Sequence, residues 1–230
     1  MQDDQRNLAV ERKRLYGAYP AKVTDIVDPD QQGRVRVQLT WSPDNDNGGY
    51  EAWARLAVPM AGNERGTWFI PDVDDEVLVM FEGGDPRRPY VIGSLWNGQD
   101  APPERMDDAG DNYIKTIVTR RDIRLTFDDT EGQETLTIET PGGHQITLKD
   151  GDQSIEIKDS SSNSVKLESG GITLTTSSKL TINAGTMEVS AGMLTVNAGM
   201  SKFSGVVKSD TDITNTVISS VYMVGAGNIW

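Results

Sequence analysis

The C-terminal half of the sequence is built from a short repeat, which limits the possible folds more than any other feature. Apolar residues recur there in pairs separated by one residue, at Leu136/Ile138, Ile146/Leu148, Ile155/Ile157, Val165/Leu167, Ile172/Leu174, Leu180/Ile182, Met187/Val189 and Leu194/Val196. The pairs are first 10, 9 and 10 residues apart, and later 7 or 8. Alternating apolar residues are typical of β-strands, and the Gly, Asn, Asp and Ser residues between them are typical of tight turns. The repeat therefore predicts a solenoid of short strands and corners that tapers toward its C-terminal end.

One chain alone is poorly suited to stabilise such a solenoid. A single-chain β-helix has longer coils, which carry stacked aromatic or long aliphatic side chains. Here each rung offers two medium-sized aliphatic side chains, and no aromatic residue lies between Phe127 and Phe203. Three chains wound together would give every strand a neighbour and leave free edges only at the ends. We therefore expect a homotrimer, a tapering three-chain intertwined β-helix whose faces interleave strands from all three chains.

The N-terminal part has a different composition. Four of the five tryptophans lie before residue 97, and short alternating segments recur there, such as residues 34–40 (RVRVQLT). Turn-forming stretches such as Asp28-Pro29-Asp30 separate these segments. Five or so short strands without a helix predict an OB-like barrel, so the fold class is all-β. The expected boundaries are an N-terminal extension (1–15), the barrel (16–98), a linker (99–112), the β-helix shaft (113–208) and a tip segment (209–230).

The composition argues against several classes of function. A net charge of −13 disfavours nucleic-acid binding, which needs basic surface to neutralise phosphates. The chain has no cysteine and a single histidine, His144, so cysteine-based sites are excluded and histidine metal sites are disfavoured. No nucleophile elbow, P-loop or zinc-protease motif occurs, and we expect neither a catalytic site, nor a cofactor, nor a metal. The first residues lack an apolar stretch of signal-peptide length, so we expect no secretion signal there.

Several clusters of polar residues could be interpreted as metal sites, but their sequence patterns do not favour this. Residues 44–49 (DNDNGG) lack the ligand and the final glutamate that a calcium loop requires, so a polar hairpin loop is favoured. We expect His144 to be an outward-pointing strand residue. The remaining acidic residues are interpreted as solvated turn charges: Asp72, Asp74, Asp75 and Glu76 before one strand, and Asp128, Asp129 and Glu131 at the first corner of the solenoid.

Several longer motifs occur in the order found in one known family. Residues 28–37, 53–56, 66–79 and 82–98 resemble the OB-fold module of contractile-injection spikes. This family comprises phage baseplate assembly protein V, the cell-puncturing spike of contractile phage tails, and the VgrG proteins of type VI secretion. Residues 125–134 and 139–144 are similar to the entry into the family's trimeric β-helix. The resemblance covers roughly residues 16–205.

The resemblance implies a structural role without catalysis. The trimer would dock by its OB domain on a separate hub protein, since only about 15 residues precede the barrel, and would contact an inner tube or cargo. A PAAR-like tip protein would sit on the C-terminal end, because no His-x-His pair is present to bind iron at an apex. Sheath contraction would push this spike through a target membrane, which it contacts only transiently. By this resemblance the chain would be made in the bacterial cytoplasm without a signal peptide. It would then be incorporated into the baseplate of a phage tail, a type VI-like system or an extracellular contractile particle.

The tip segment brings back large apolar residues. We expect the tip protein to bind at Val221, Tyr222, Met223, Ile229 and Trp230. The alternative is that this tail folds back to cap the chain's own solenoid. The main competing function is a trimeric tail adhesin or receptor-binding needle, against which the aromatic-free shaft argues. A cell-wall hydrolase and a single-stranded nucleic-acid-binding OB domain are less favoured, because paired carboxylates in a cleft and a basic surface are not apparent.

Overall fold

The structure is a computed structural model that describes residues 14–40, 50–216 and 218–219. In these residues the regular structure consists of fourteen strands and one short 3₁₀ turn, η2 (Glu82–Gly84). None of the helical structure in this part of the chain is long and apolar enough to cross a membrane. The predicted all-β class is therefore confirmed. By its internal contacts the chain divides into two units, one ending at Lys179 and the other beginning at Leu180.

Five strands close into a barrel in the order β1-β2-β3-β7-β6. Their bounds are β1 (Ala18–Asp25), β2 (Val35–Gln38), β3 (Glu51–Leu56), β6 (Glu76–Phe81) and β7 (Pro89–Ser94). Neighbouring strands are antiparallel except for β3 and β7, which are parallel. A two-stranded hairpin of β4 (Ala61–Gly62) and β5 (Arg65–Gly66) lies in the connection between β3 and β6. The barrel predicted from the sequence is confirmed.

Side chains alternate between the interior and the surface along each barrel strand, and those that point inward fill the interior. Val35 and Val37 of β2 are fully buried, whereas Arg36 between them points outward. β-branched valines suit such positions because they pack well on a pleated surface. The core consists of Ala21, Val23, Val35, Val37, Leu39, Ala54, Val77, Val79, Phe81 and Val91.

The strand registers define two ends of the barrel. At one end Leu15 donates its backbone N–H to Gly84 O, so the chain enters beside the β6–β7 loop. At the other end the first residue of β6, Glu76, accepts the backbone N–H of Leu95, directly after β7. We call these the entry end and the exit end. The β1–β2 loop, the β4–β5 hairpin and the start of the linker all belong to the exit end.

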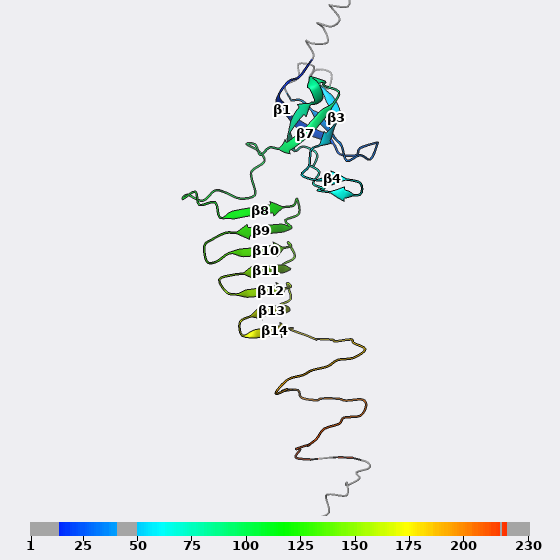
Figure 1. Cartoon of the computed structure of the whole chain (residues 1–230), viewed down its shortest axis with the longest axis vertical. Coiled ribbons are helices and arrows are strands. Elements are labelled where there is room, and N and C mark those ends of the chain that lie inside the picture. Colours follow the sequence, from blue (N-terminus) through cyan, green and yellow to red (C-terminus); the bar gives the residue numbers. More distant parts are fainter. Residues whose placement is uncertain (1–13, 41–49, 217, 220–230) are drawn as a thin grey trace, which may run out of the picture. The chain divides into compact units, whose positions relative to one another are not determined.

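Seven consecutive strands then form a regular antiparallel sheet, the ladder (Figure 1). Each strand has five residues and pairs with its neighbours in sequence, so that β8 and β14 form the two edges. The bounds are β8 (Ile114–Val118), β9 (Arg124–Asp128), β10 (Thr135–Glu139), β11 (Gln145–Lys149), β12 (Ser154–Lys158), β13 (Ser164–Glu168) and β14 (Gly171–Thr175). The five apolar pairs from Leu136/Ile138 to Ile172/Leu174 all lie on strands, as the repeat predicts.

The ladder differs from the sequence-based expectation in one respect. Interleaving would place strands of other chains between those of this chain, but from β8 to β14 every ladder neighbour belongs to the same chain. The ten-residue spacing explains this, because a five-residue strand followed by a turn of about five residues allows the chain to return beside itself. The turn between β13 and β14 is shorter still, with only Ser169 and Gly170 between the strands.

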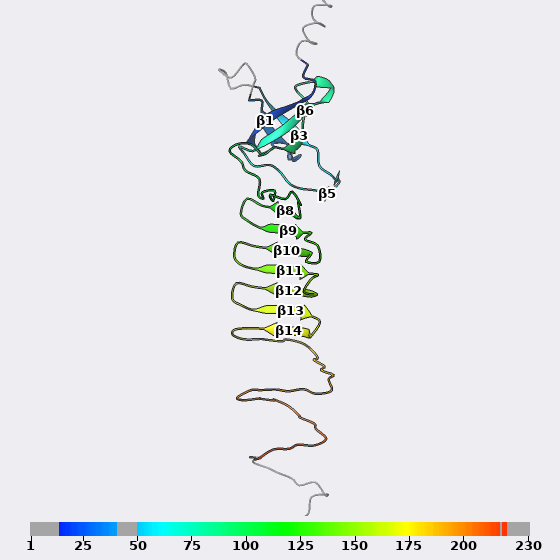
Figure 2. The same ribbon diagram turned by 90° about the vertical axis from the view of Figure 1, so that its left-hand side faces the viewer.

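After β14 the pairing stops. No strand is assigned among the described residues from 176 onward, although the alternating apolar pairs continue at seven-residue spacing. Figure 2 shows this part of the chain as a succession of open legs. This part of the chain thus has the sequence pattern of strands but no partner strand among the described residues of the same chain. The pairs concerned are Leu180/Ile182, Met187/Val189 and Leu194/Val196.

The barrel core gives a direct test of the fold. Leu39 is 2 % exposed and follows β2, so the substitution Leu39→Ala should lower the free energy of barrel unfolding by about 2–5 kcal/mol. Val27→Ala is the control, because Val27 is 77 % exposed and its truncation should cost less than about 0.5 kcal/mol. Urea unfolding followed by tryptophan fluorescence measures both changes. Equal effects of the two substitutions would contradict this assignment of the core.

Candidate functional site

The apolar pairs of the ladder line up on one face of the sheet. In an antiparallel sheet, residues paired across strands project to the same side. Ile138 is paired with Leu125 on one side and with Ile146 on the other, and Ile155 is paired with Leu148 and Leu167. We call the resulting strip the apolar face: Ile117, Leu125, Phe127, Leu136, Ile138, Ile146, Leu148, Ile155, Ile157, Val165, Leu167, Ile172 and Leu174.

The apolar face lies open in the single chain. Phe127 is 42 % exposed, Ile157 48 % and Ile172 72 %, whereas the valines of the barrel core are almost completely buried. The face crosses all seven strands of the ladder. Contiguous apolar surface on this scale is unusual on a soluble monomer and marks a surface that another molecule covers.

The opposite face of the ladder is polar. Thr116, Thr126, Thr137 and Thr147 occupy corresponding positions on successive strands, and the Oγ atoms of Thr116 and Thr126 are 3.3 Å apart. Farther along, Glu156 is paired with Lys166, whose Nζ lies 2.5 Å from a carboxylate oxygen of Glu168. This face suits contact with water. The ladder therefore has one face for a partner and one for solvent.

The second unit extends the same pattern without a covering layer. Large apolar side chains remain exposed along it, namely Leu180, Ile182, Met187, Val189, Leu194, Val196, Phe203 and Val206. Extended backbone outside a sheet leaves N–H and C=O groups that need partners once water is displaced. The surface that needs covering thus includes both apolar side chains and peptide groups.

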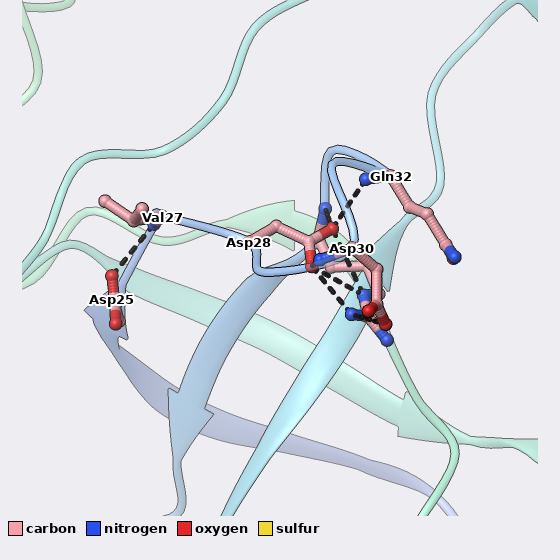
Figure 3. A network of polar contacts seen from close by, with 6 residues as sticks. Asp25, Val27, Asp28, Asp30 and Gln32 are labelled. Carbon is pink, nitrogen blue, oxygen red and sulfur yellow. Dashed lines mark hydrogen bonds and ion pairs between the residues drawn. The ribbon is translucent and has the colours of Figure 1, made fainter.

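A charged turn between β1 and β2 stabilises the exit end of the barrel. The sequence alone indicates only that a turn separates two strands here. The Asp28 carboxylate accepts the backbone N–H groups of Asp30, Gln32 and Arg34 (Figure 3). It also accepts a hydrogen bond from the Arg34 guanidinium, with 2.6 Å between Nη2 of Arg34 and Oδ1 of Asp28. The same guanidinium lies over the Trp53 ring, 5.8 Å from the ring centroid. The hydrogen bonds from Arg34 hold the pKa of Asp28 well below its usual range. This turn fixes the β1–β2 loop.

Similar carboxylate turns stabilise the ladder. Asp128, at the end of β9, accepts the hydroxyl of Thr130 at 2.6 Å and its backbone N–H at 3.0 Å, which lowers the pKa of Asp128. Asp159, after β12, accepts the Asn163 side-chain amide and the Asn163 and Ser161 backbone N–H groups, which lowers the pKa of Asp159. An Asp directly after an alternating strand is the sequence signal for such turns.

The other candidate residues fall in separate places. Asp74 pairs with Lys22 at 2.8 Å, and Asp75 accepts the backbone N–H of Asp72 at 2.8 Å, so these acids serve the turn before β6. Asp129 pairs with Lys115 at 2.8 Å. His144 is exposed in the turn directly before β11. In the described part of the chain no cluster of three or more acidic or histidine side chains could hold a metal ion.

Two sequence-based expectations cannot be placed on this structure. The loop at residues 44–49 lies outside the described residues. So do the expected tip-binding residues Val221, Tyr222, Met223, Ile229 and Trp230.

Comparison with known proteins gives a match for each of the two regions. Residues 19–96 match the family described as the type VI secretion system/phage-baseplate injector OB domain. Residues 135–200 match the family described as the phage baseplate V C-terminal trimerisation domain. The first match coincides with the barrel strands, and the second extends from β10 into the unpaired second unit.

Individual relatives are spike proteins of type VI secretion. The chain is 31 % identical to the spike protein VgrG1a of Pseudomonas aeruginosa over 135 residues, which is 56 % of this chain and 21 % of that protein. It is 31 % identical to VgrG1b of the same species over 52 % of this chain and 17 % of that protein. The actin cross-linking toxin VgrG1 of Vibrio cholerae is 27 % identical over 61 % of this chain and 13 % of that protein. The matched region thus spans about a fifth or less of the length of these relatives.

The charged turn predicts an acid-sensitive barrel. The folded-state pKa of Asp28 lies below the unfolded value of about 3.9, so its stabilisation is complete above that value and is lost as the pH falls toward the folded-state pKa. We expect Asp28→Asn to lower the melting temperature at pH 7 and to reduce the further decrease between pH 5 and about pH 2.5. Circular dichroism melts at several pH values measure both effects.

The control for this experiment is Asp108→Asn, which removes one negative charge from an exposed position in the linker. It shows what the loss of a charge does without the loss of the turn. If Asp28→Asn melted with the same pH profile as the parent chain, the charged turn would not stabilise the barrel.

Proposed function

We propose that this chain forms the central spike of a contractile injection apparatus, because residues 19–96 match an injector OB domain and residues 135–200 match a phage baseplate trimerisation domain. The observation that carries this proposal is the open apolar face on the ladder. A trimer conceals that face completely, whereas an isolated chain leaves it in water. The proposed boundaries are those expected from the sequence: barrel 16–98, linker 99–112, shaft 113–208 and tip 209–230.

In the first section of the proposed shaft, each chain supplies one complete face. Three ladders turn their apolar faces to a common axis, and their threonine-rich faces form the outer surface. Ile146, Ile155 and their neighbours then interdigitate with the same residues of the other two copies. The medium-sized aliphatic side chains suit a narrow axis, which accounts for the lack of aromatic residues between Phe127 and Phe203.

In the second section, the three chains interleave. A seven-residue spacing leaves room for a strand of about five residues and a corner of about two. β13 and β14 still pair across such a corner, whereas the described residues after Thr175 form no strand pair within this chain. Each leg after Thr175 therefore passes to the next face of the prism. Its neighbours above and below come from the other copies, which supply the hydrogen-bond partners that this chain lacks. The expected three-chain interleaving is assigned to this section.

This architecture suits the transmission of force. Successive rungs of a β-sheet are separated by about 4.8 Å, and ten or eleven rungs give a shaft on the order of 50 Å. The hydrogen bonds between rungs run along the shaft, in the direction of the thrust. We propose that the barrels dock on a separate hub, that the C-terminal end carries a PAAR-like tip protein, and that sheath contraction drives the assembly through a membrane. The chain itself would act without turnover.

The assembly is tested by a pair of substitutions on one strand. Ile146→Asp places a charge on the apolar face of β11, whereas Thr147→Asp places the same charge on the polar face one residue later. An unpaired charge buried at the axis costs several kcal/mol per copy, so Ile146→Asp should prevent trimer formation and Thr147→Asp should not. Light scattering measures the mass, which should be three times 25.2 kDa for the parent and for Thr147→Asp. A monomeric parent chain would contradict the proposal.

The spike role is tested in cells that assemble the apparatus. We expect cells that produce Ile146→Asp in place of the parent chain to yield no intact particles by electron microscopy. Cells that produce Thr147→Asp should yield particles at the parental level. Particles of normal number and activity with Ile146→Asp would exclude a central spike role, even if the purified protein is a trimer.

A further inference from the structure

A tryptophan at the exit end of the barrel is held in place but hardly covered. Trp68 precedes β6 and is 74 % exposed. Its ring lies against Gly33 of the β1–β2 loop so closely that a β-carbon at position 33 would come within 2.9 Å of it. Gly33 also has φ +69°, a conformation that favours glycine. The Asp28–Arg34 turn fixes this loop, and the loop in turn supports one side of the Trp68 ring.

The free side of Trp68 borders a groove at the exit end. The residues that line it come from the β1–β2 loop and from the chain between the end of β3 and the start of β6, which includes the β4–β5 hairpin. Its apolar lining is Leu56, Val58, Met60, Trp68 and Ile70. Met60 is itself half exposed, and Phe69, next to Trp68, is 65 % exposed. A pre-positioned aromatic side chain beside an apolar groove is the usual anchor of a protein–protein contact, because little entropy is lost when it is covered.

We propose that a neighbouring copy of this chain covers Trp68 and the groove beside it, so that the three barrels contact one another as well as the ladders. This inference rests on the trimer of the proposed function. Ser94, the last residue of β7, and Ile114, the first of β8, are joined by residues 95–113. A connection of this length spans at most about 70 Å. Three barrels tethered to one shaft are therefore held at an effective concentration on the order of millimolar, at which a weak contact forms.

The charges that line the groove favour a second copy of this chain as the molecule that covers it. The chain carries a net charge of −13, so two copies repel each other over most of their surface. The charged residues that line the groove are Arg55, Glu64 and Arg65, and their sum is +1. A copy with an acidic surface can approach there without the repulsion that it meets elsewhere. The exposed apolar side chains at the exit end would otherwise remain in water on the assembled spike.

Photo-crosslinking of the full chain tests this contact. Benzoylphenylalanine is placed at position 68 in one variant and, as the matched control, at position 16 in another. Tyr16 is also aromatic and 67 % exposed, but it lies at the entry end of the barrel. After irradiation and boiling in detergent, we expect covalent products at two and three times 25.2 kDa for position 68, and at least fivefold fewer for position 16. Mass spectrometry of the products should place the linked residue on the barrel or the linker of another copy.

The mass of each variant before irradiation separates this inference from the proposed function. A trimer by light scattering that gives no more crosslinked product at position 68 than at position 16 would refute the barrel contact and leave the spike proposal standing. A monomer would refute both. A second variant, Trp68→Ala, keeps the test independent of the bulky probe: it should remain a trimer through its ladders but lose the crosslinks formed by benzoylphenylalanine at position 60, within the same groove.

Discussion

Every strand at the edge of a sheet presents peptide groups that need a partner, and this requirement organises the shaft. From β8 to β14 the chain meets it alone, because each five-residue strand returns beside the one before it. After Thr175 the chain no longer returns beside itself, and the same alternating pattern continues in the described residues with no strand assigned beside it. Further copies of the chain would meet both needs: they would cover the apolar face and would supply strands beside the unpaired legs.

The barrel is stabilised by its own core, and its charged side chains stabilise local turns. Its valine-rich interior is closed within one chain. The acidic residues that give the protein its low isoelectric point serve in part as turn caps, as Asp28, Asp128 and Asp159 do. Their carboxylates accept hydrogen bonds from the side chains of Arg34, Thr130 and Asn163, and also from backbone N–H groups, where the chain reverses direction. These hydrogen bonds lower their pKa values. The charge is therefore compatible with a structural protein and does not require an ionic ligand.

The periodicity of the sequence predicts the faces of the strands better than it predicts their neighbours. The pairs Leu136/Ile138 and Ile155/Ile157 indicate which side chains share a face, and the ladder confirms this. The same pairs do not show whether the adjacent strand belongs to the same chain, so the expected interleaving extends too far toward the N-terminus. The change in spacing from ten to seven residues does not decide this either, because β13 and β14 are seven residues apart and still pair within one chain. The role of Asp28 in the barrel was not predictable from alternation, since it depends on Arg34 reaching back across the loop to the carboxylate.

Hydrogen exchange on the trimeric chain tests the central claim most directly. If the legs after Thr175 pair with other copies, the backbone amides of residues 180–196 should exchange slowly, although their own chain supplies no strand beside them. The linker at residues 99–112 provides a fast-exchanging reference in the same sample. Slow exchange at residues 180–196, comparable to that of β11 and β12, is the predicted result. Exchange there as fast as in the linker, in a preparation with the mass of a trimer, would contradict the account.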